Sequence, residues 1–280
     1  MSNKTASHLV YGSVAPGFEA VRLEFENNFA FRNELGAAFA VYHRSQKVVD
    51  LWGGFRDKKR QQPWREDTLT TVFSTTKGIA SLTLAVAHSR GWLEWDAPVA
   101  QYWPEFAQAG KGSVTVRQLV AHQAGLCAID EPLDIAILAD FDRLAEILAK
   151  QPPAWTPGVR HGYHAISLGW YQGELLRRVD PEGRSLGRFF REEIAEPLGL
   201  DFHIGLPTSF PESRIATIAP SSFLKLPFQV GRRSQIPLRM ILAMLNPRSL
   251  TARAFNNPKL KNAGGFNSDP EMRAVEIPAA

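Results

Sequence analysis

The spacing of apolar residues predicts a helix near the start of the chain and a β-hairpin directly after it. Apolar side chains recur every three or four positions across residues 16–33, which is the period of one face of a helix. The residues that set this period are Phe18, Val21, Phe25 and Phe29. The runs 37–42 and 47–53 then place β-prone residues on either side of the polar segment 44–46, a pattern typical of two antiparallel strands joined by a short turn.

A third β-prone run, 68–73, leads into a helix that begins at Ser74 and continues to His88, and Gly91 is placed to end it. Further helices are expected over residues 115–122, 140–151, 167–179 and 186–195, and a shorter one over 239–246. A β-bearing opening followed by a helical middle is the α+β pattern.

We interpret residues 1–280 as one domain with three parts. The part from about 10 to 75 carries the sheet, the part from 76 to 205 is mainly helical, and the part from 206 to 280 is irregular. The end of the chain is rich in Asn, Pro and Gly and shows no periodicity, whereas domains usually end at a packed element. We therefore expect a truncated domain whose sheet is incomplete at its C-terminal end.

Composition describes an ordinary globular protein and argues against several classes of function. The net charge of +4 comes without a basic stripe, so no nucleic-acid partner is expected. No apolar stretch reaches the about 18 residues of a membrane span, and the first residues lack a signal-peptide core, so we expect a cytoplasmic protein without a membrane partner. The single cysteine, Cys127, excludes an intrachain disulfide, and the seven histidines lack metal-ligand spacing, so neither a metal nor another cofactor is expected.

Ser74 and Lys77 are the strongest candidates for chemistry. On a helix that begins at Ser74 they lie about one turn apart on the same face, where an amine can turn a hydroxyl into a nucleophile. The simpler alternative is that Ser74 only caps the helix, since serine is a preferred N-cap residue. A second Ser-x-x-Lys pair, Ser222 and Lys225, is followed by Pro227, which disfavours a continuing helix, and we interpret it as a coincidence.

Several ordered blocks beyond this pair resemble the serine β-lactamase and penicillin-binding protein superfamily. The blocks are Asp-Thr-Leu-Thr-Thr-Val-Phe-Ser-Thr-Thr-Lys at 67–77, Gly-Trp-Leu-Glu-Trp-Asp-Ala-Pro-Val at 91–99, Val-Thr-Val-Arg-Gln-Leu-Val-Ala-His-Gln-Ala-Gly-Leu at 114–126, Trp-Thr-Pro-Gly at 155–158, Tyr-His-Ala at 163–165 and Glu-Pro-Leu-Gly-Leu at 196–200. Their order and spacing agree with the family from about residue 15 to residue 205. Tyr-His-Ala in the second motif is most similar to class C-like esterases and β-lactamase-related proteins.

This resemblance implies an antiparallel sheet flanked by helices, an all-helical lobe, and a serine hydrolase that works through an acyl-enzyme. Ser74 would attack a carbonyl carbon, and either Lys77 or Tyr163 would take its proton; the residues leave open which acts first. A lysine base needs a pKa below its usual value of about 10.4, through burial and the positive end of the helix dipole.

Three histidines in these blocks are given no catalytic role. His122 stands in a block that shapes a helix end in the family, and we interpret it as structural. His161 and His164 flank Tyr163 and are interpreted as supporting or surface residues.

Two departures from the family pattern bear on activity. Ala165 stands where the family usually has Asn, whose amide contacts a β-lactam or peptide, so short-chain esters are the expected substrates. The third motif, Lys- or His-x-Gly on a late strand, is not found after residue 200, because the nearest match, 203–205, follows the block 196–200 too closely. That strand supplies an oxyanion-hole N–H, and losing one such donor costs about 10²–10³ in rate, so we expect weak turnover and marginal stability.

Three functions stay open at this stage. The first is a serine hydrolase that acts on a small ester or amide substrate with Ser74, Lys77 and Tyr163 as its catalytic residues. The second is a catalytically inactive, truncated family member with at most a binding role. The third, a penicillin-binding protein that processes peptidoglycan, requires export, and the absence of a signal peptide argues against it.

Overall fold

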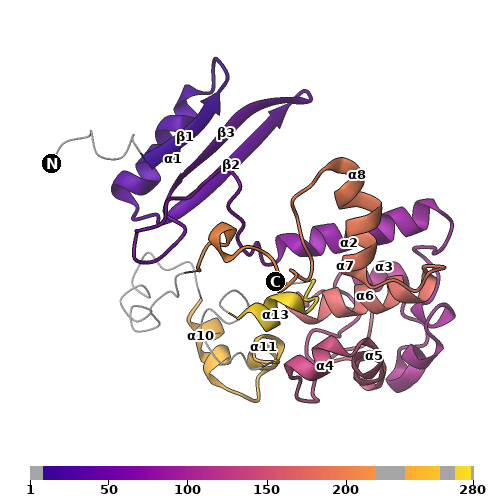
Figure 1. Ribbon diagram of the computed structural model, residues 1–280. Coiled ribbons are helices and arrows are strands. Elements are labelled where there is room, and N and C mark those ends of the chain that lie inside the picture. The colour runs from indigo at the N-terminus through magenta and orange to yellow at the C-terminus, as the bar shows by residue number, and fades with distance from the viewer. Residues whose placement is uncertain (1–8, 219–236, 259–268, 279–280) are drawn as a thin grey trace. The chain divides into compact units, whose positions relative to one another are not determined.

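The computed structural model describes residues 9–218, 237–258 and 269–278, and the chain forms two compact units. Of the described residues, the first unit contains 9–71 and 209–218, and the second contains the rest. Every strand among the described residues belongs to the first unit, and the second unit is helical (Figure 1). The predicted α+β class is confirmed.

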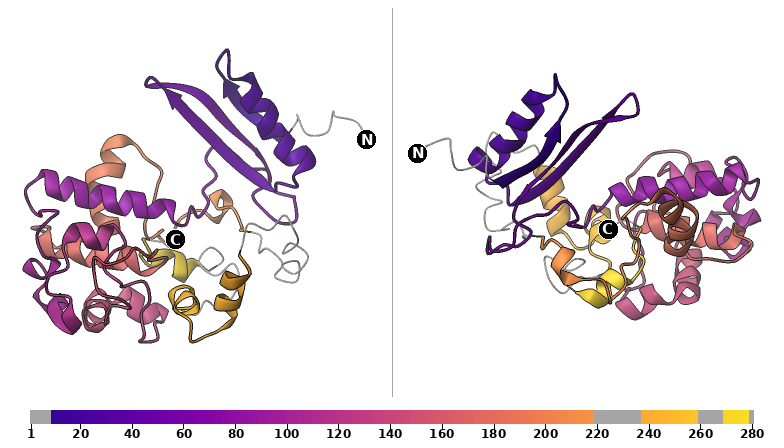
Figure 2. Two further views of the ribbon diagram at one scale, coloured as in Figure 1. Left: turned by 180° about the vertical axis from the view of Figure 1, so that it is seen from behind. Right: turned by 45° about the horizontal axis from the view of Figure 1, so that its top comes forward.

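The first unit is built around a three-stranded antiparallel sheet of order β1-β3-β2. The strands β2 (Gly36–His43) and β3 (Gln46–Gly54) form the predicted hairpin, and β1 (Val10–Val14) pairs with the other side of β3. The predicted helix α1 (Glu19–Phe31) packs against β1 and β3, as Figures 1 and 2 show. The buried side chains of this core are Val10, Phe25, Val48, Val49 and Leu51.

Residues 209–218 belong to the first unit because they pair with the chain just before the second unit begins. The Leu69 N–H donates to the Arg214 carbonyl oxygen at 2.7 Å, and the Leu69 carbonyl accepts from the Ala216 N–H at 2.8 Å. The strand predicted over 68–73 is therefore wrong: within the described residues this run contributes a single bridge, at Leu69. Among the described residues, no strand pairs with the rest of this β-prone run, so it serves as a connection into α2.

Helices make up the second unit. Among the described residues its α-helices are α2 (Thr75–Ser89), α3 (Val116–Val120), α4 (Ile135–Ala139), α5 (Phe141–Lys150), α6 (Ser167–Val179), α7 (Leu186–Phe190), α8 (Glu196–Leu198), α10 (Leu238–Leu245), α11 (Leu250–Phe255) and α13 (Pro270–Ala274). The helices predicted from Ser74, over 115–122, 140–151, 167–179 and 239–246 are confirmed within a few residues, and Gly91 ends the first of them with a φ of 73°. The helix predicted over 186–195 divides into α7 and a π-helical turn at Arg191–Ala195.

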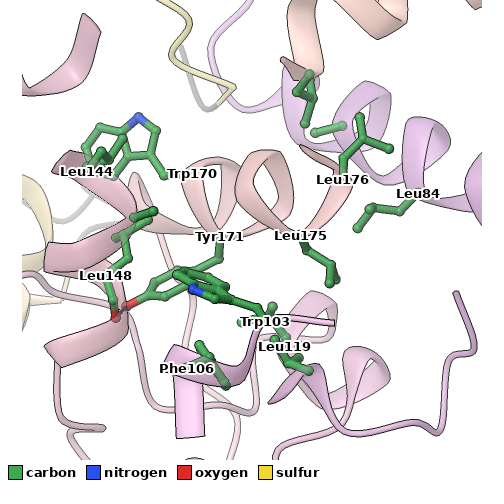
Figure 3. Packing of buried hydrophobic residues seen from close by; sticks show 14 of the residues in the cluster. Leu84, Trp103, Phe106, Leu119, Leu144, Leu148, Trp170, Tyr171, Leu175 and Leu176 are labelled. Carbon is green, nitrogen blue, oxygen red and sulfur yellow. Dashed lines mark hydrogen bonds between the residues drawn. The ribbon is translucent and has the colours of Figure 1, made fainter. Parts of the chain in front are cut away.

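The core of the second unit forms where α6 packs against α2 and α5. Trp103, Phe106 and Tyr171 are fully buried at its centre (Figure 3), with the Trp103 and Tyr171 ring centroids 6.3 Å apart. The Tyr171 hydroxyl donates to the Leu148 carbonyl at 3.2 Å, so its polar atom is satisfied inside an apolar cluster. Because α2 contributes to this core, the residues at its beginning are held by a rigid support.

The strand β1 and the α-helices α8, α4, α11 and α13 were not predicted. The last three have five or six residues, too few for a helical period to show in the sequence. Each begins at a side-chain cap instead; Asp134, for example, accepts the Ile137 N–H at 2.9 Å. The helices α10, α11 and α13 lie within residues 206–280, the part that the sequence indicated to be irregular. Ser222 and Lys225 lie outside the described residues.

Candidate active site

Ser74 lies immediately before the first residue of α2, and it is exposed. Its side chain makes no capping hydrogen bond to the helix, so the structure does not support the alternative that Ser74 is an ordinary N-cap. The preceding residue, Phe73, has a φ of 48°, in the left-handed region that residues other than glycine seldom adopt. The chain therefore turns sharply into α2 and presents the Ser74 hydroxyl at the turn.

Lys77 is buried one turn further along α2, with 7% of its surface exposed. Its Nζ donates to the Ser74 Oγ at 3.2 Å and to the Ala165 carbonyl oxygen at 2.6 Å. Burial lowers the pKa of Lys77, and Tyr163 opposes this shift through its charge and hydroxyl. An amine whose pKa is lowered is more often neutral, and the neutral amine can accept the proton of the hydroxyl beside it.

Tyr163 lies in the segment that precedes α6 and is half-exposed. The Lys77 Nζ lies 5.2 Å from the centroid of its ring, which is within the range of a cation–π contact. The structure thus brings together the three residues that the sequence predicted as a site, Ser74, Lys77 and Tyr163, and all three belong to the second unit.

Two histidines that sequence reasoning left aside adjoin this group. The His122 ring lies 4.9 Å from the Tyr163 ring, centroid to centroid, and 5.3 Å from the His164 ring. His164 is fully buried, so the possibility that it is a surface residue is excluded. The clustering of His161, Tyr163 and His164 was visible in the sequence. The approach of His122 was not, because it lies more than 40 positions earlier in the chain.

Neither a metal site nor a membrane span stands out among the described residues. No group of three or more His, Cys, Asp or Glu side chains within 9–218, 237–258 and 269–278 could hold a metal ion. None of the helices in these same residues combines the length and the apolar character needed to cross a bilayer. Cys127 is buried, and burial raises the pKa of its thiol.

The fold and the site together place a Ser-x-x-Lys pair at the beginning of α2, with a tyrosine ring beside the lysine amine. The sequence profile of the Beta-lactamase family matches residues 25–233 of the chain. The chain belongs to this family.

Its relatives include proteins named for esterase and for penicillin-binding properties. The esterase/beta-lactamase LipL of Mycobacterium tuberculosis is 38% identical over 214 residues, which cover 76% of this chain and 49% of LipL. A solved family VIII carboxylesterase is 39% identical with a TM-score of 0.80, over 97% of this chain and 67% of that chain. A solved penicillin-binding protein homolog from Caulobacter crescentus is 41% identical with a TM-score of 0.75, with the same coverage of both chains.

The chain spans about half the length of the curated relatives that it matches. The matched part contains the Ser74 segment and the Tyr163 segment, since both fall within residues 25–233.

Proposed function

We propose that the chain carries the nucleophile-bearing part of a serine hydrolase that cleaves small acyl esters through an acyl-enzyme on Ser74. The observation that carries this proposal is the contact between the Lys77 Nζ and the Ser74 Oγ, at 3.2 Å, in a site where burial lowers the pKa of the lysine. The names of LipL and of the family VIII carboxylesterase support an ester as the substrate.

In the proposed reaction the neutral Lys77 amine takes the proton of Ser74 as the Oγ attacks the carbonyl carbon of the ester. A C–O bond forms and the carbonyl π electrons move onto oxygen, which gives a tetrahedral intermediate. When this intermediate collapses, the bond to the alcohol breaks and the alcohol leaves with the proton that Lys77 had accepted. Water then attacks the acyl-enzyme by the same steps in reverse and releases the acid.

We assign the first proton transfer to Lys77 because its Nζ contacts the Ser74 hydroxyl directly. Tyr163 adjoins the same amine, so its phenol is placed to exchange a proton with Lys77 and to favour the charged amine after the transfer. The Ala165 carbonyl also accepts a hydrogen bond from this amine and fixes its direction.

Active-site labelling tests the proposal. A fluorophosphonate probe should label the wild-type chain at Ser74, and Ser74→Ala should abolish the labelling. Ser222→Ala is the matched control, because Ser222 belongs to the other Ser-x-x-Lys sequence, and it should leave labelling unchanged. Labelling that survives Ser74→Ala would refute the assignment. A folded wild-type chain that takes up no probe would favour the alternative of a family member that only binds.

A further inference from the structure

The two amides on either side of Tyr163 are both held by one residue, His122. The Gly162 N–H donates to the His122 carbonyl oxygen at 3.1 Å, and the His164 N–H donates to the His122 Nδ1 at 3.0 Å. Tyr163 lies between these two amides in the sequence. Its backbone is therefore fixed from both sides by the main chain and the side chain of a single residue.

The ring of His164 holds the same turn from within. Its Nε2 accepts the Leu126 N–H at 2.8 Å, so the proton of the neutral ring resides on Nδ1, which lies 2.6 Å from the Gly162 carbonyl oxygen. The His122 Nδ1 likewise accepts an amide proton, which places the proton of its neutral ring on Nε2. Both rings thus work as neutral imidazoles with a defined tautomer.

The backbone of His122 is also specialised for this position. It has a φ of 60°, in the left-handed region, directly after the end of α3. This conformation aims its carbonyl at Gly162 while its ring packs against the Tyr163 ring. The same conformation completes the end of α3, because the His122 N–H donates to the Leu119 carbonyl oxygen at 3.2 Å and the Gln123 N–H donates to the Gln118 carbonyl oxygen at 2.8 Å.

We propose that His122 is the positioning residue for Tyr163, holding both flanking amides so that the phenol stays over the Lys77 amine. The inference rests on the proposed function, because it gives Tyr163 a part in proton transfer at Lys77. The ionisable groups that face the His122 ring are Tyr163, His161, His164 and Lys77. At neutral pH the ring acts as an acceptor, because burial lowers the pKa of His122 to about 4.

Two substitutions separate the hydrogen bond from the rest of the side chain. His122→Ala removes the acceptor, whereas His122→Asn places its Oδ1 where the Nδ1 stood and tolerates a left-handed backbone. His161→Ala is the matched control, since this imidazole packs edge-on against His122 at 5.7 Å but holds neither amide.

The decisive experiment combines ester kinetics at pH 7 with hydrogen exchange at the amides of residues 162 and 164. We expect His122→Ala to lower kcat for p-nitrophenyl butyrate by about 10²-fold, the effect of a displacement of about 1 Å, with a smaller change in KM. Both amides should exchange faster. His122→Asn should recover most of kcat and of the protection, and His161→Ala should resemble wild type.

Equal exchange at the two amides in wild type and His122→Ala would overturn the inference, as would a folded His122→Asn no better than His122→Ala. Hydrogen exchange does not depend on turnover. If Ser74 takes up no probe and yet the amides of residues 162 and 164 lose protection in His122→Ala, the proposed function fails. The role of His122 in holding the backbone around Tyr163 then still stands.

Discussion

Ala165 takes part in the site through its backbone while its side chain offers no polar group. Its carbonyl oxygen accepts from the Lys77 Nζ at 2.6 Å, and its methyl group is buried. The family usually has an asparagine here, whose amide contacts the amide of a β-lactam. A site without that donor and acceptor no longer favours amide substrates over esters, so an ester should be the better substrate.

We therefore expect kcat/KM for p-nitrophenyl butyrate to exceed that for nitrocefin. Ala165→Asn should raise the ratio of nitrocefin to butyrate turnover by roughly tenfold, because it restores the amide contact. Ala165→Leu is the control, since leucine fills a similar volume without hydrogen-bonding groups. A wild-type preference for nitrocefin, or equal ratios in the two variants, would contradict this account of specificity.

At the scale of elements, a buried lysine closes the C-terminal end of α5. The Lys111 Nζ donates to the carbonyl oxygens of Ala149 and Gln151, each at 2.8 Å, and to that of Gln108 at 2.9 Å. The last carbonyls of a helix have no partner within the helix, so a cation there satisfies them and favours the negative end of the dipole. Lys111 thus joins the end of α5 to the turn at Pro104–Gly110.

Removing this amine should destabilise the protein without touching the site. We expect Lys111→Met to lower the free energy of unfolding by about 1–3 kcal/mol, the cost of buried carbonyls left without donors. Lys150→Met is the matched control, because Lys150 ends the same helix but is exposed. Urea denaturation of both variants measures the difference, and equal midpoints would show that the three carbonyls find other partners.

The sequence predicted the elements that depend on the spacing of residues close together in the chain. The period of Phe18, Phe25 and their neighbours gave α1, and the spacing of Ser74 and Lys77 along one helix gave their contact. Tyr163 came only from the resemblance, because nothing in the local pattern sets it beside α2. The contact between His122 and the His164 amide was missed because it joins residues 42 positions apart through a backbone N–H, which every residue type except proline carries.

For the whole molecule, stability should fall in acid because the second unit buries neutral imidazoles. Burial lowers the pKa of His164 and of His122 to about 4 each, below the usual value of about 6.5. Between these values the unfolded chain binds more protons than the folded chain. Their contribution to stability is therefore complete above pH about 6.5 and decreases as the pH falls toward 4.

We expect this decrease to reach at most about 3 kcal/mol for His164, which is fully buried. His164→Gln keeps an acceptor for the Leu126 N–H but does not titrate, so its stability should change less between pH 7 and pH 4.5. Urea denaturation followed by tryptophan fluorescence measures both proteins. Parallel pH dependence in wild type and His164→Gln would show that other groups cause the acid loss.

The helical unit carries Ser74, Lys77 and Tyr163. The reactivity of Ser74 therefore reports whether this unit is folded. If the two units open independently, the reactivity of Ser74 follows the opening of the helical unit alone. A covalent probe would then count the molecules in which that unit is intact, even in a mixture where the sheet of the first unit has already melted. The reactivity of Ser74 would then report the unfolding of the helical unit, whereas a signal averaged over the whole chain would combine the unfolding of both units.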